Sequence, residues 1–478
     1  MDPQIIQSHF AASAATYDQW RQRNQFYHQD LMKLCRFYVT PGLRVLEIGC
    51  ATGHLLNAVQ PKLGVGIDWA EPMVTYASQN YPQYHFYCLD ATTCSPLDLP
   101  SDQRQFDVIL LADVLGYVPD IQQLLTNLQD FCQDHTRILM TFHNFLWEPL
   151  LHLAERLGQR RPQPPQNWLS MSDTLNLLQI TGYIPIHQGQ RFLVPKPIPG
   201  VSSLINRFIA PLPLINHLCL TQYILARKMP VPQDPQTLTC SIVVPARNEA
   251  GNIAPLVARC PVFGKKTELI FVEGHSRDQT WEVIQEVIQK TPQSERFKIL
   301  ALQQKGVGKG DAVRLGFEVA SGDILMILDA DMTVQPEDLI HFWEVIVSGR
   351  GEVINGSRLV YPHSHVAMPF INRLANKFFA FLFSYLLGRP IKDTLCGTKV
   401  LWRRDYERIA AGRSYFGDFD PFGDFDLLFG AARLGLQCVD VPVRYQPRSY
   451  GQSNIAHVKE GLILLKMCWL AAQKLKFF

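Results

Sequence analysis

Two carboxylates separated by one small residue stand where a strongly apolar run ends. Residues 324–328 read Ile-Leu-Met-Ile-Leu, and Asp329, Ala330 and Asp331 follow. Carboxylate oxygens so placed can hold a hard divalent cation, Mg²⁺ or Mn²⁺, whose shell a diphosphate completes. Such a metal neutralises the charge that develops on a departing nucleotide. The spacing therefore predicts a metal-assisted transfer from a nucleotide donor, with Asp329 and Asp331 as the metal ligands.

Other polar clusters lie at the ends of apolar runs in the same half of the chain. Residues 240–249 end in Pro-Ala-Arg-Asn-Glu, residues 268–276 end in Glu-Gly-His-Ser, and residues 305–314 form a glycine loop that carries Lys309. In open α/β sheets, ligands bind outside the carboxyl ends of the strands. These clusters are therefore expected to meet at one edge of a sheet.

A different glycine turn occurs near the start of the chain. Residues 45–54, Val-Leu-Glu-Ile-Gly-Cys-Ala-Thr-Gly-His, read as a buried strand, a turn and the start of a helix. Glycines let the backbone bend tightly and approach a ligand. The Gly-x-Gly-x-x-Gly pattern of dinucleotide folds is absent. Glu47, just before the glycines, suits a positively charged ligand better than a diphosphate.

Acids also end the strands expected after this turn. Asp68 follows Val-Gly-Ile and can bind both hydroxyls of a ribose, as the equivalent acid does in dinucleotide folds. Asp90 follows the next strand and can accept a hydrogen bond from an adenine amine, and Asp113 closes the strand after that. The pattern predicts a nucleoside site along this sheet edge.

These four motifs, in this order, resemble the class I methyltransferases that use S-adenosyl-L-methionine (S-adenosylmethionine), over about residues 15–228. The resemblance implies a Rossmann-like sheet and S-adenosylmethionine as the methyl donor. No catalytic base announces itself; His143 and Tyr117 are candidate bases or acceptor contacts, and His54 is expected on a helix face. The resemblance places Gly49, Cys50 and Gly53 at the methionine part of the donor, Asp68 at the ribose, and Asp90 with Ala91 at the adenine, with Glu47 beside them.

The later half, about residues 239–455, resembles family 2 glycosyltransferases of GT-A fold, most closely the dolichyl-phosphate mannose and glucose synthase-like branch. The resemblance implies transfer of a sugar, with inversion, from a nucleotide-sugar. The residues that it assigns to the nucleotide-sugar and metal site are Pro245, Ala246, Asn248, Glu249, Glu273, Lys309, Asp329, Ala330, Asp331 and Arg448.

Two departures from that branch affect the donor site. The usual Asp-Asp-Gly-Ser is Glu273-Gly-His-Ser276 here, which leaves the nucleotide preference open. The usual Ser-Lys ending is Ser453-Asn454, which removes one cation near the donor or acceptor. Arg448 could still bind a phosphate with two hydrogen bonds.

The general base of sugar transfer is not evident. Asp424 and Asp426 are the catalytic candidates, with loop positioning or helix capping as the alternative role. A phosphate acceptor is already ionised near neutral pH and needs little help from a base. The absence of an obvious base therefore fits a polyprenyl-phosphate-like lipid acceptor.

Two apolar segments suggest contact with a membrane surface. Residues 378–388 are uncharged but too short to span a bilayer. The C-terminal helix, residues 457–478, places Lys459, Lys466 and Gln473 on one stripe opposite a wide apolar face. This pattern is typical of a helix that lies on anionic lipid, the alternative being that it packs on the domain core or on a second copy. Residues 208–226 contain two prolines and are expected to form a loop and a buried strand.

Strand-like apolar runs alternate with helical segments along the sequence, and these elements must position the candidate site residues. Such alternation predicts an α/β fold. A chain of 478 residues suggests two or three domains. A helical region is expected over residues 20–40. We predict a methyltransferase domain over residues 1–229, a proline-rich linker over residues 230–237, and a glycosyltransferase domain with a C-terminal amphipathic helix over residues 238–478.

Composition narrows the location and the partners. The formal net charge is +2 and there is no long block of like charges, so nucleic acid is not an expected partner. The 11 cysteines show no Cys-x-x-Cys pair, and the start of the chain has no signal-peptide pattern. We therefore expect reduced thiols and a cytoplasmic protein, peripheral on the inner membrane face.

The predicted function is a bifunctional transferase that uses a nucleotide-sugar donor, a lipid-phosphate acceptor and S-adenosylmethionine, with an unknown methyl acceptor, possibly a glycan. One alternative is a monofunctional glycosyltransferase with a non-catalytic methyltransferase-like docking module; intact Glu47 and Asp68 argue against it. Another is a processive or soluble-acceptor glycosyltransferase, but the Gln-x-x-Arg-Trp motif of processive enzymes is absent from the sequence.

Overall fold

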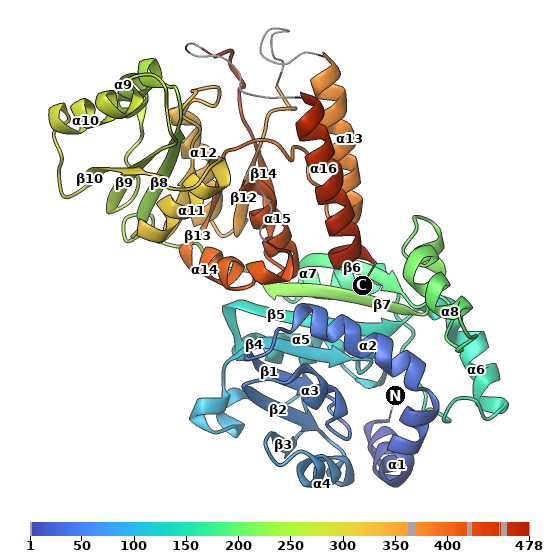
Figure 1. Ribbon diagram of the computed structural model, residues 1–478. Coiled ribbons are helices and arrows are strands. Elements are labelled where there is room, and N and C mark those ends of the chain that lie inside the picture. Colours follow the sequence, from blue (N-terminus) through green and yellow to red (C-terminus); the bar gives the residue numbers. More distant parts are fainter. Residues whose placement is uncertain (1, 362–369, 418–422, 449, 451–456, 478) are drawn as a thin grey trace. The chain divides into compact units, whose positions relative to one another are not determined.

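The computed structural model describes residues 2–361, 370–417, 423–448, 450 and 457–477, with backbone alone for residues 370–372 and 457–460. The chain divides into two compact units, Met1–Met229 and Pro230–Lys476. Each unit contains one seven-stranded sheet covered by helices (Figure 1). The two sheets are described in turn.

The sheet of the first unit has the strand order β3-β2-β1-β4-β5-β7-β6. Its first five strands run parallel, and β7 runs antiparallel to both of its neighbours. All five parallel strands therefore present their carboxyl ends at one edge. The strands are β1 (Arg44–Ile48), β2 (Leu63–Asp68), β3 (His85–Cys88), β4 (Phe106–Ala112), β5 (Cys132–His143), β6 (Tyr183–Arg191) and β7 (Thr221–Lys228).

Helices cover both faces of this sheet. Helices α2 and α3 share a buried apolar cluster with one face, and α5 and α7 share another with the opposite face. The helices of this unit are α1 (Pro3–Arg23), α2 (Gln25–Tyr38), α3 (His54–Val59), α4 (Glu71–Asn80), α5 (Ile121–Leu128), α6 (Glu148–Arg156), α7 (Met171–Ile180) and α8 (Val201–Leu204).

The N-terminal helices differ from the sequence prediction. A single helical region was expected over residues 20–40, whereas helix begins at Pro3 and breaks at Asn24. The Asp2 side chain caps the first helix by accepting from the Gln4 amide at 2.9 Å, and Pro3 occupies a first-turn position where its missing N–H costs nothing. Within α1 only Ile6 and Ala14 are buried, so its apolar periodicity was too weak to reveal it.

The sheet of the second unit has the strand order β10-β9-β8-β11-β13-β12-β14. Strand β13 runs antiparallel to β11 and β12, and every other pairing is parallel. The strands are β8 (Thr239–Ala246), β9 (Lys266–Glu273), β10 (Phe297–Gln303), β11 (Ile324–Ile327), β12 (Val353–Ser357), β13 (Lys399–Trp402) and β14 (Cys438–Pro442).

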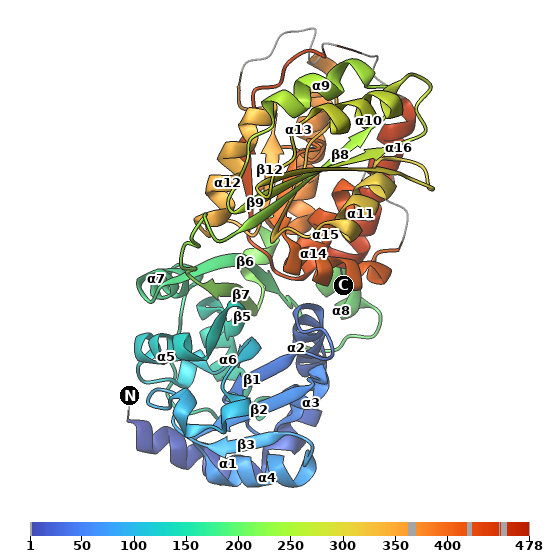
Figure 2. The same ribbon diagram turned by 90° about the vertical axis from the view of Figure 1, so that its left-hand side faces the viewer.

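The second sheet is also covered on both faces (Figure 2). Apolar side chains of α9, α10 and α12 meet one face, and those of α11, α14 and α15 meet the other. The helices are α9 (Ala250–Arg259), α10 (Thr280–Lys290), α11 (Lys309–Val319), α12 (Leu339–Val347), α13 (Phe370–Leu387), α14 (Arg403–Ala411), α15 (Asp424–Arg433) and α16 (His457–Ala471), the last continuing as a π-helical segment, Ala472–Lys476.

Helices α13 and α16 lie side by side within the second unit (Figure 1). Phe383 of α13 and Met467 of α16 are buried, whereas other large apolar side chains of the same helices remain exposed. Among the described residues, no helix is both long and apolar enough to cross a bilayer. The segment expected to form a loop and a buried strand, residues 208–226, ends in β7 as the sequence predicts.

Candidate active sites

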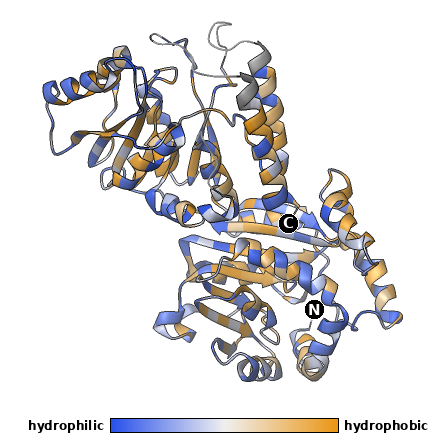
Figure 3. Ribbon diagram, viewed as in Figure 1, coloured by the Kyte–Doolittle hydropathy of each residue, from blue (hydrophilic) through white to orange (hydrophobic). Residues whose placement is uncertain are grey.

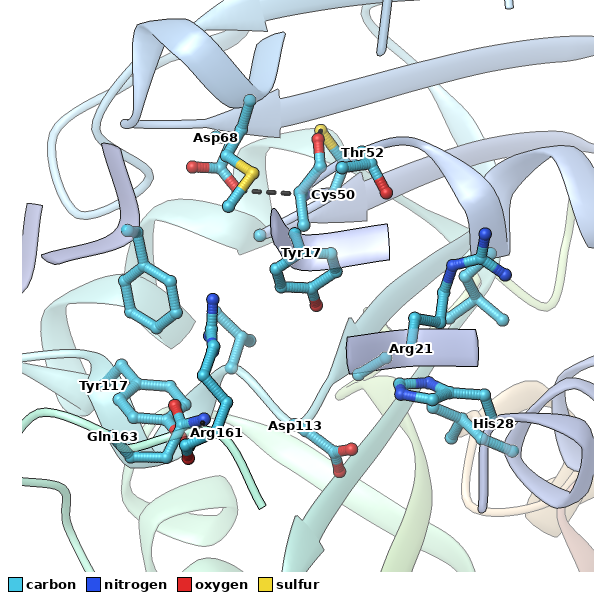
Figure 4. Close-up of a pocket in the computed structure, with 18 of the residues that line it drawn as sticks. Tyr17, Arg21, His28, Cys50, Thr52, Asp68, Asp113, Tyr117, Arg161 and Gln163 are labelled. Atoms are coloured by element: carbon cyan, nitrogen blue, oxygen red, sulfur yellow. Dashed lines mark hydrogen bonds between the residues drawn. The ribbon is translucent and has the colours of Figure 1, made fainter. Parts of the chain in front are cut away.

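A cavity of about 350 Å³ lies at the carboxyl ends of the parallel strands of the first unit (Figure 4). Its walls come from the loops after β1, β2, β3 and β4 and from the N-terminal helices α1 and α2. Of the residues that the sequence places at the donor site, the cavity is lined by Glu47, Gly49, Cys50, Asp68, Asp90 and Ala91.

The loop after β1 has a backbone shaped by its glycines. Gly49 and Gly53 adopt φ values of 69° and 74°, which side-chain-bearing residues rarely adopt. A Cβ at Gly49 would also lie 2.6 Å from Cγ2 of Val114, so the loop could not lie so close to β4 with any other residue. Gly53 forms the start of α3 and is not among the residues that line the cavity.

Asp68 organises this loop. Its Oδ2 accepts from the Ala51 amide at 2.9 Å, and its Oδ1 accepts from the Ala70 amide at 3.0 Å. Ala51 itself has a φ of 44°, a strained conformation that is often found at ligand sites. Burial raises the pKa of Asp68, while the two amides act in the opposite direction. The carboxylate is thus oriented toward the cavity from the end of β2.

Glu47 is only 3% exposed, and its Oε2 has no hydrogen-bond partner among the described residues. Burial, followed by the nearby Asp68 carboxylate, raises the pKa of Glu47 to about 8, although a backbone N–H of Leu56 opposes the shift. A buried carboxyl with one unpaired oxygen favours a cationic ligand, because the cation would restore the ionised form.

Asp90 and Cys50 differ in what they offer a ligand. Asp90 is exposed, and its Oδ1 accepts from the amide and hydroxyl of Thr92 at 2.8 and 2.7 Å. Cys50 is buried, and its Sγ would lie 2.8 Å from a Cβ on Gly66. The thiol therefore packs between strands, and burial holds its pKa well above the usual range.

The far end of the cavity holds a polar network that sequence reasoning did not assemble. The Tyr27 hydroxyl donates to Asp113 Oδ2 at 2.5 Å, and the Thr141 hydroxyl donates to Asp113 Oδ1 at 2.7 Å. His28 and His143 also line this end. Burial lowers the pKa of His28 to about 4 and lowers that of His143 as well, so both rings are neutral at pH 7.

The side chains from α1 and α2 could not be found from motifs. Tyr17 and Tyr27 face the cavity from helices that carry no recognisable signature, and burial holds both of their pKa values well above the usual range. Tyr117, a candidate from the sequence, donates its hydroxyl to Gln163 at 2.9 Å. His54 also lines the cavity, although a helix-face role was expected for it.

In the second unit, each of the paired carboxylates faces a cation. Lys309 Nζ lies 2.5 Å from Asp329 Oδ1, and Arg448 Nη2 lies 2.8 Å from Asp331 Oδ2. The Thr333 amide and hydroxyl donate to Asp331 Oδ1 at 3.0 and 2.8 Å. The carboxyl end of β11 therefore gathers two acids and two bases.

Lys309 and Asp329 each stabilise the charged form of the other. Burial alone would raise the pKa of Asp329, but the adjacent Lys309 ammonium lowers it. Burial would lower the pKa of Lys309, but Asp329 and Asp424 hold it above its usual range. Both groups are therefore charged at neutral pH, and together they form a half-buried ion pair at the site.

Glu249 and Asn248 shape the loop after β8. Asn248 has a φ of 57°, and its Oδ1 accepts from the Arg277 amide at 2.7 Å. Glu249 accepts from Asn252 at 2.6 Å and from Arg448 Nη1 at 3.4 Å, and burial raises its pKa to about 7. Arg448 thus joins the β8 loop to the β11 carboxylates. Pro245 and Ala246, at the end of β8, precede this loop.

The Glu273 carboxylate accepts hydrogen bonds from its own loop and from the neighbouring strand β10. Its Oε1 accepts from the Ser276 amide at 2.5 Å, and its Oε2 accepts from Gln303 at 3.4 Å. The side chain is 4% exposed. Ser453 and Asn454 lie outside the described residues, as does the side chain of Lys459.

Comparisons with known proteins match the two units separately. Residues 241–409 match the family model described as Glycosyl transferase family 2, and residues 46–138 match one described as Methyltransferase domain. The first unit thus contains a methyltransferase-like region, and the second contains a region similar to family 2 glycosyltransferases. The methyltransferase unit and the glycosyltransferase unit are named accordingly below.

The curated relatives each cover less than half of this chain. A dolichol-phosphate mannosyltransferase of Pyrococcus furiosus is 29% identical over 221 residues, covering 45% of this chain and 58% of the relative. An undecaprenyl-phosphate 4-deoxy-4-formamido-L-arabinose transferase of Pectobacterium carotovorum is 31% identical over 223 residues, covering 46% and 63%. A malonyl-[acyl-carrier protein] O-methyltransferase of Bacillus cereus is 26% identical over 166 residues, covering 33% and 60%. The chain thus spans less than two thirds of the length of each of these relatives.

The two catalytic candidates on α15 have different surroundings. Asp426 Oδ2 lies 2.6 Å from Arg314 Nη2 and 2.8 Å from Arg413 Nε, so it is held in an ion-pair network. Asp424 Oδ1 lies 3.2 Å from Nζ of Lys399, which is fully buried and also donates to the Cys396 carbonyl at 2.6 Å. The pKa of Lys309 is raised partly by Asp424, which places that carboxylate near the β11 cluster.

The two carboxylates suit a divalent cation, but a bound donor diphosphate would have to complete the coordination shell. Within the described ranges, no three His, Cys, Asp or Glu side chains converge in a way that could hold a metal. Asp329 and Asp331 each carry one cationic partner, so a metal would displace an ammonium or a guanidinium. A donor diphosphate could complete the metal shell and take up the displaced Lys309 and Arg448.

Proposed function

We propose that the chain is a bifunctional transferase. The glycosyltransferase unit moves a sugar from a nucleotide-sugar, with inversion, to a lipid phosphate such as a polyprenyl phosphate. The methyltransferase unit moves a methyl group from S-adenosylmethionine to a second acceptor. The observation that carries the sugar transfer is the pairing of Asp329 and Asp331 with Lys309 and Arg448 at the carboxyl end of β11.

In sugar transfer, the residues of the chain bind and orient the donor diphosphate. Lys309 and Arg448 neutralise its charge, and Arg448 can make two parallel hydrogen bonds to it. Asp329 and Asp331 would hold a Mg²⁺ or Mn²⁺ ion, whose role is to stabilise negative charge on the leaving nucleotide. Glu249 and Asn248 fix the β8 loop that borders the donor.

The acceptor side of the glycosyltransferase unit needs little base catalysis. A phosphate oxygen attacks the anomeric carbon, the bond from that carbon to the donor diphosphate breaks, and no proton must be removed. Asp426 is held by two arginines, which favours a positioning role for it. Asp424 is nearer the β11 cluster and remains the better catalytic candidate, with the Lys399 ammonium keeping its side chain in place.

An apolar face on α13 and α16 supports a lipid acceptor. Exposed aromatic and leucine side chains lie on both helices, and Lys377 and Lys466 are exposed on them too. Basic residues flanking an apolar face favour an anionic bilayer surface. We place this face on the inner surface of the cell membrane. The residues of this α13–α16 face are Leu374, Phe378, Phe381, Leu462, Leu465 and Trp469.

In methyl transfer, the methyltransferase unit would bind the donor nucleoside through Asp68 and Asp90 and its cationic sulfur end near Glu47. The acceptor atom forms a bond to the methyl carbon as the carbon–sulfur bond breaks, and that electron pair returns to sulfur. An acceptor hydroxyl must also lose its proton. His28 is neutral at pH 7 and can take that proton, whereas Asp113 already accepts from two hydroxyls, which favours an orienting role for it.

The test measures the two activities separately on the full chain. A screen of nucleotide-sugars, scored by nucleotide release with a polyprenyl phosphate and Mn²⁺, should identify one donor. Calorimetry with S-adenosylhomocysteine, the demethylated donor product, should show one site per chain. Nucleotide release without binding of S-adenosylhomocysteine would favour a monofunctional glycosyltransferase with a docking module. Absence of release with every donor would refute the sugar-transfer assignment.

A further inference from the structure

Two neighbouring segments of the methyltransferase unit expose an unusual number of large apolar side chains. Helix α6 and the segment around α8 are rich in hydrophobic residues (Figure 3), and many of these side chains are exposed. Leu214, at a loop tip, is 82% exposed and has a φ of 71°. We call this surface the apolar rim: Phe145, Leu146, Leu150, Leu153, Leu157, Ile198, Val201, Leu204, Phe208, Ile209, Leu212, Leu214 and Leu218.

The apolar rim borders the cavity. Leu151 and Ala154 line the cavity from α6, the same helix that exposes Leu150 and Leu153. Pro195 and Lys196 line it just before the second apolar segment begins at residue 198. A molecule that enters the cavity past these residues would therefore pass over apolar surface. Exposed apolar areas of this extent mark sites of interaction with a lipid, a ligand or another protein.

Within the cavity, Arg161 is a cation without an acidic partner among the described residues. Its Nη1 is buried and has no hydrogen-bond partner in that part of the chain. Its guanidinium carbon lies 5.4 Å from the Phe10 ring centroid and 5.0 Å from that of Tyr17. Figure 4 shows the side chain reaching from its loop toward Tyr17. The adjacent Arg160, by contrast, pairs with Glu155 at 2.5 Å.

A half-buried guanidinium with a buried, unpaired nitrogen beside aromatic rings is costly to leave without a partner, because desolvation disfavours its charge. Burial indeed lowers the pKa of Arg161. An anionic group inside the cavity would recover that cost, and a planar carboxylate or a phosphate matches the guanidinium best. Along the second segment of the rim the fixed charge is also positive, since residues 192–220 contain Lys196 and Arg207 and no acid.

We propose that the methyl acceptor is an anionic amphiphile, whose head group binds Arg161 and whose hydrocarbon chain leaves the cavity over the apolar rim. This inference rests on the methyltransferase part of the proposed function, and it names the substrate class of that site. A neutral, water-soluble acceptor would leave both the guanidinium and the rim without a partner. A protein docked on the rim would account for the exposed leucines but not for the buried cation.

The experiment uses the full chain saturated with S-adenosylhomocysteine and four probes: monododecyl phosphate and laurate below their micelle concentrations, inorganic phosphate, and acetate. Isothermal calorimetry should show each amphiphile binding at least tenfold more tightly than its chainless counterpart. Equal affinity of amphiphile and chainless anion would overturn the proposal. The two head groups distinguish a phosphate acceptor from a carboxylate acceptor, and binding by either supports the shared chemistry.

Two sets of variants separate the contribution of the anionic head group to binding from that of the hydrocarbon tail. Arg161→Gln should weaken binding of every anion at least tenfold, whereas Arg156→Gln, an exposed arginine on α6, should not. The double variant Leu150→Ser/Leu153→Ser should remove most of the difference in affinity between monododecyl phosphate and inorganic phosphate. Its affinity for inorganic phosphate should stay unchanged. Leu97→Ser, also highly exposed but away from the rim, is the matched control. Because these leucines are already exposed, the serine variants should fold.

Binding of S-adenosylhomocysteine is measured first in every variant. The methyltransferase assignment and the proposed acceptor class can then fail separately. If the wild-type chain does not bind S-adenosylhomocysteine, the methyltransferase assignment itself falls. If it binds that ligand but prefers no amphiphile, only the present inference falls. If Arg161→Gln weakens S-adenosylhomocysteine at least tenfold and leaves the probes unaffected, Arg161 binds the carboxylate of the donor, and the proposed acceptor head group is wrong.

Discussion

Lys309 Nζ and Asp329 Oδ1 lie 2.5 Å apart at the centre of the glycosyltransferase site, and the backbone of Gly397 makes room for both. A Cβ on Gly397 would overlap the Lys309 ammonium and the Asp329 carboxylate. The ion pair therefore occupies space that only glycine leaves open. Because the ammonium contacts Asp329, Lys309 would compete with a metal for that carboxylate in the proposed mechanism.

We predict that Lys309→Met lowers nucleotide-sugar turnover about a hundredfold, the scale typical of losing one group that stabilises developing charge. The same variant should bind Mn²⁺ more tightly in the absence of donor, because Asp329 loses its competing cation. Turnover assays and electron paramagnetic resonance titration of Mn²⁺ test the two effects. Lys305→Met, an exposed lysine in the same loop, is the control. Unchanged Mn²⁺ affinity in Lys309→Met would contradict the competition.

Turnover of nucleotide-sugar should require a divalent metal held by the paired carboxylates. Asp331→Asn should lose at least nine tenths of the activity while its melting temperature stays near that of the wild type, since the change conserves volume. Glu337→Gln removes an acid from an exposed ion pair and should leave turnover unaffected. Full activity in the presence of a chelator would show that the carboxylates serve only the structure.

The donor nucleoside should depend on Asp68. Asp68→Ala in the full chain should reduce S-adenosylhomocysteine affinity at least tenfold, because the loop amide of Ala51 and the ligand ribose both lose their acceptor. Asp102→Ala, an exposed acid in the same unit, is the matched control. Calorimetry on the two variants and the wild type provides the comparison, and equal affinities would rule out this role.

The buried Glu47 makes the stability of the methyltransferase unit depend on pH. Its pKa is about 8 in the folded unit and lies well below that when unfolded, so the folded state holds the extra proton between these values. Stability should therefore fall as pH rises from about 4.5 to about 8 and then level off. Glu47→Gln should abolish this contribution, worth on the order of a few kcal/mol.

Thermal unfolding of both proteins at pH 5 and pH 8.5 measures the effect. The melting temperature of Glu47→Gln relative to the wild type should be higher at pH 8.5 than at pH 5. Saturation with cationic S-adenosylmethionine should stabilise the wild type more at pH 8.5 than the neutral S-adenosylhomocysteine does. A melting-temperature difference that is the same at both pH values would mean that Glu47 titrates normally.

Membrane association of the glycosyltransferase unit should depend on the α13–α16 face. Phe381→Ser/Trp469→Ser should reduce flotation with vesicles of phosphatidylglycerol and phosphatidylethanolamine several-fold, because two large exposed rings lose their burial in lipid. Ile340→Ser, an exposed residue of α12, should not affect it. If the double variant floats as well as the wild type, this face is not the lipid contact.

The central strands could be predicted because burial on both faces forces nearly continuous apolar runs. Strand β1 ends at Ile48, just before the predicted glycine turn, and β11 lies within its predicted run. Helix α1 was missed because few of its residues are buried, so capping by Asp2 rather than periodicity marks its start. Strand β12 and the edge strand β14 escaped individual prediction because their apolar runs are short.

The acids at strand ends were predictable for a similar reason: a polar residue that follows a buried strand stands out. What the sequence could not give were contacts between distant segments. Lys309 meets Asp329, and Arg448 meets both Asp331 and Glu249, across separations that depend on the sheet order. Tyr27 reaches Asp113 from a helix with no motif, so only the folded chain reveals that network.

The strand order of the first sheet has a consequence for synthesis of the protein. Strand β7 ends at Lys228 and is inserted between β5 and β6, so every strand of that sheet precedes the first residue of the second sheet, Thr239. Domains generally fold as units, with the N-terminal one first as the ribosome extends the chain. The methyltransferase unit can thus close its core before the glycosyltransferase strands emerge, which limits mispairing between two sheets of equal size.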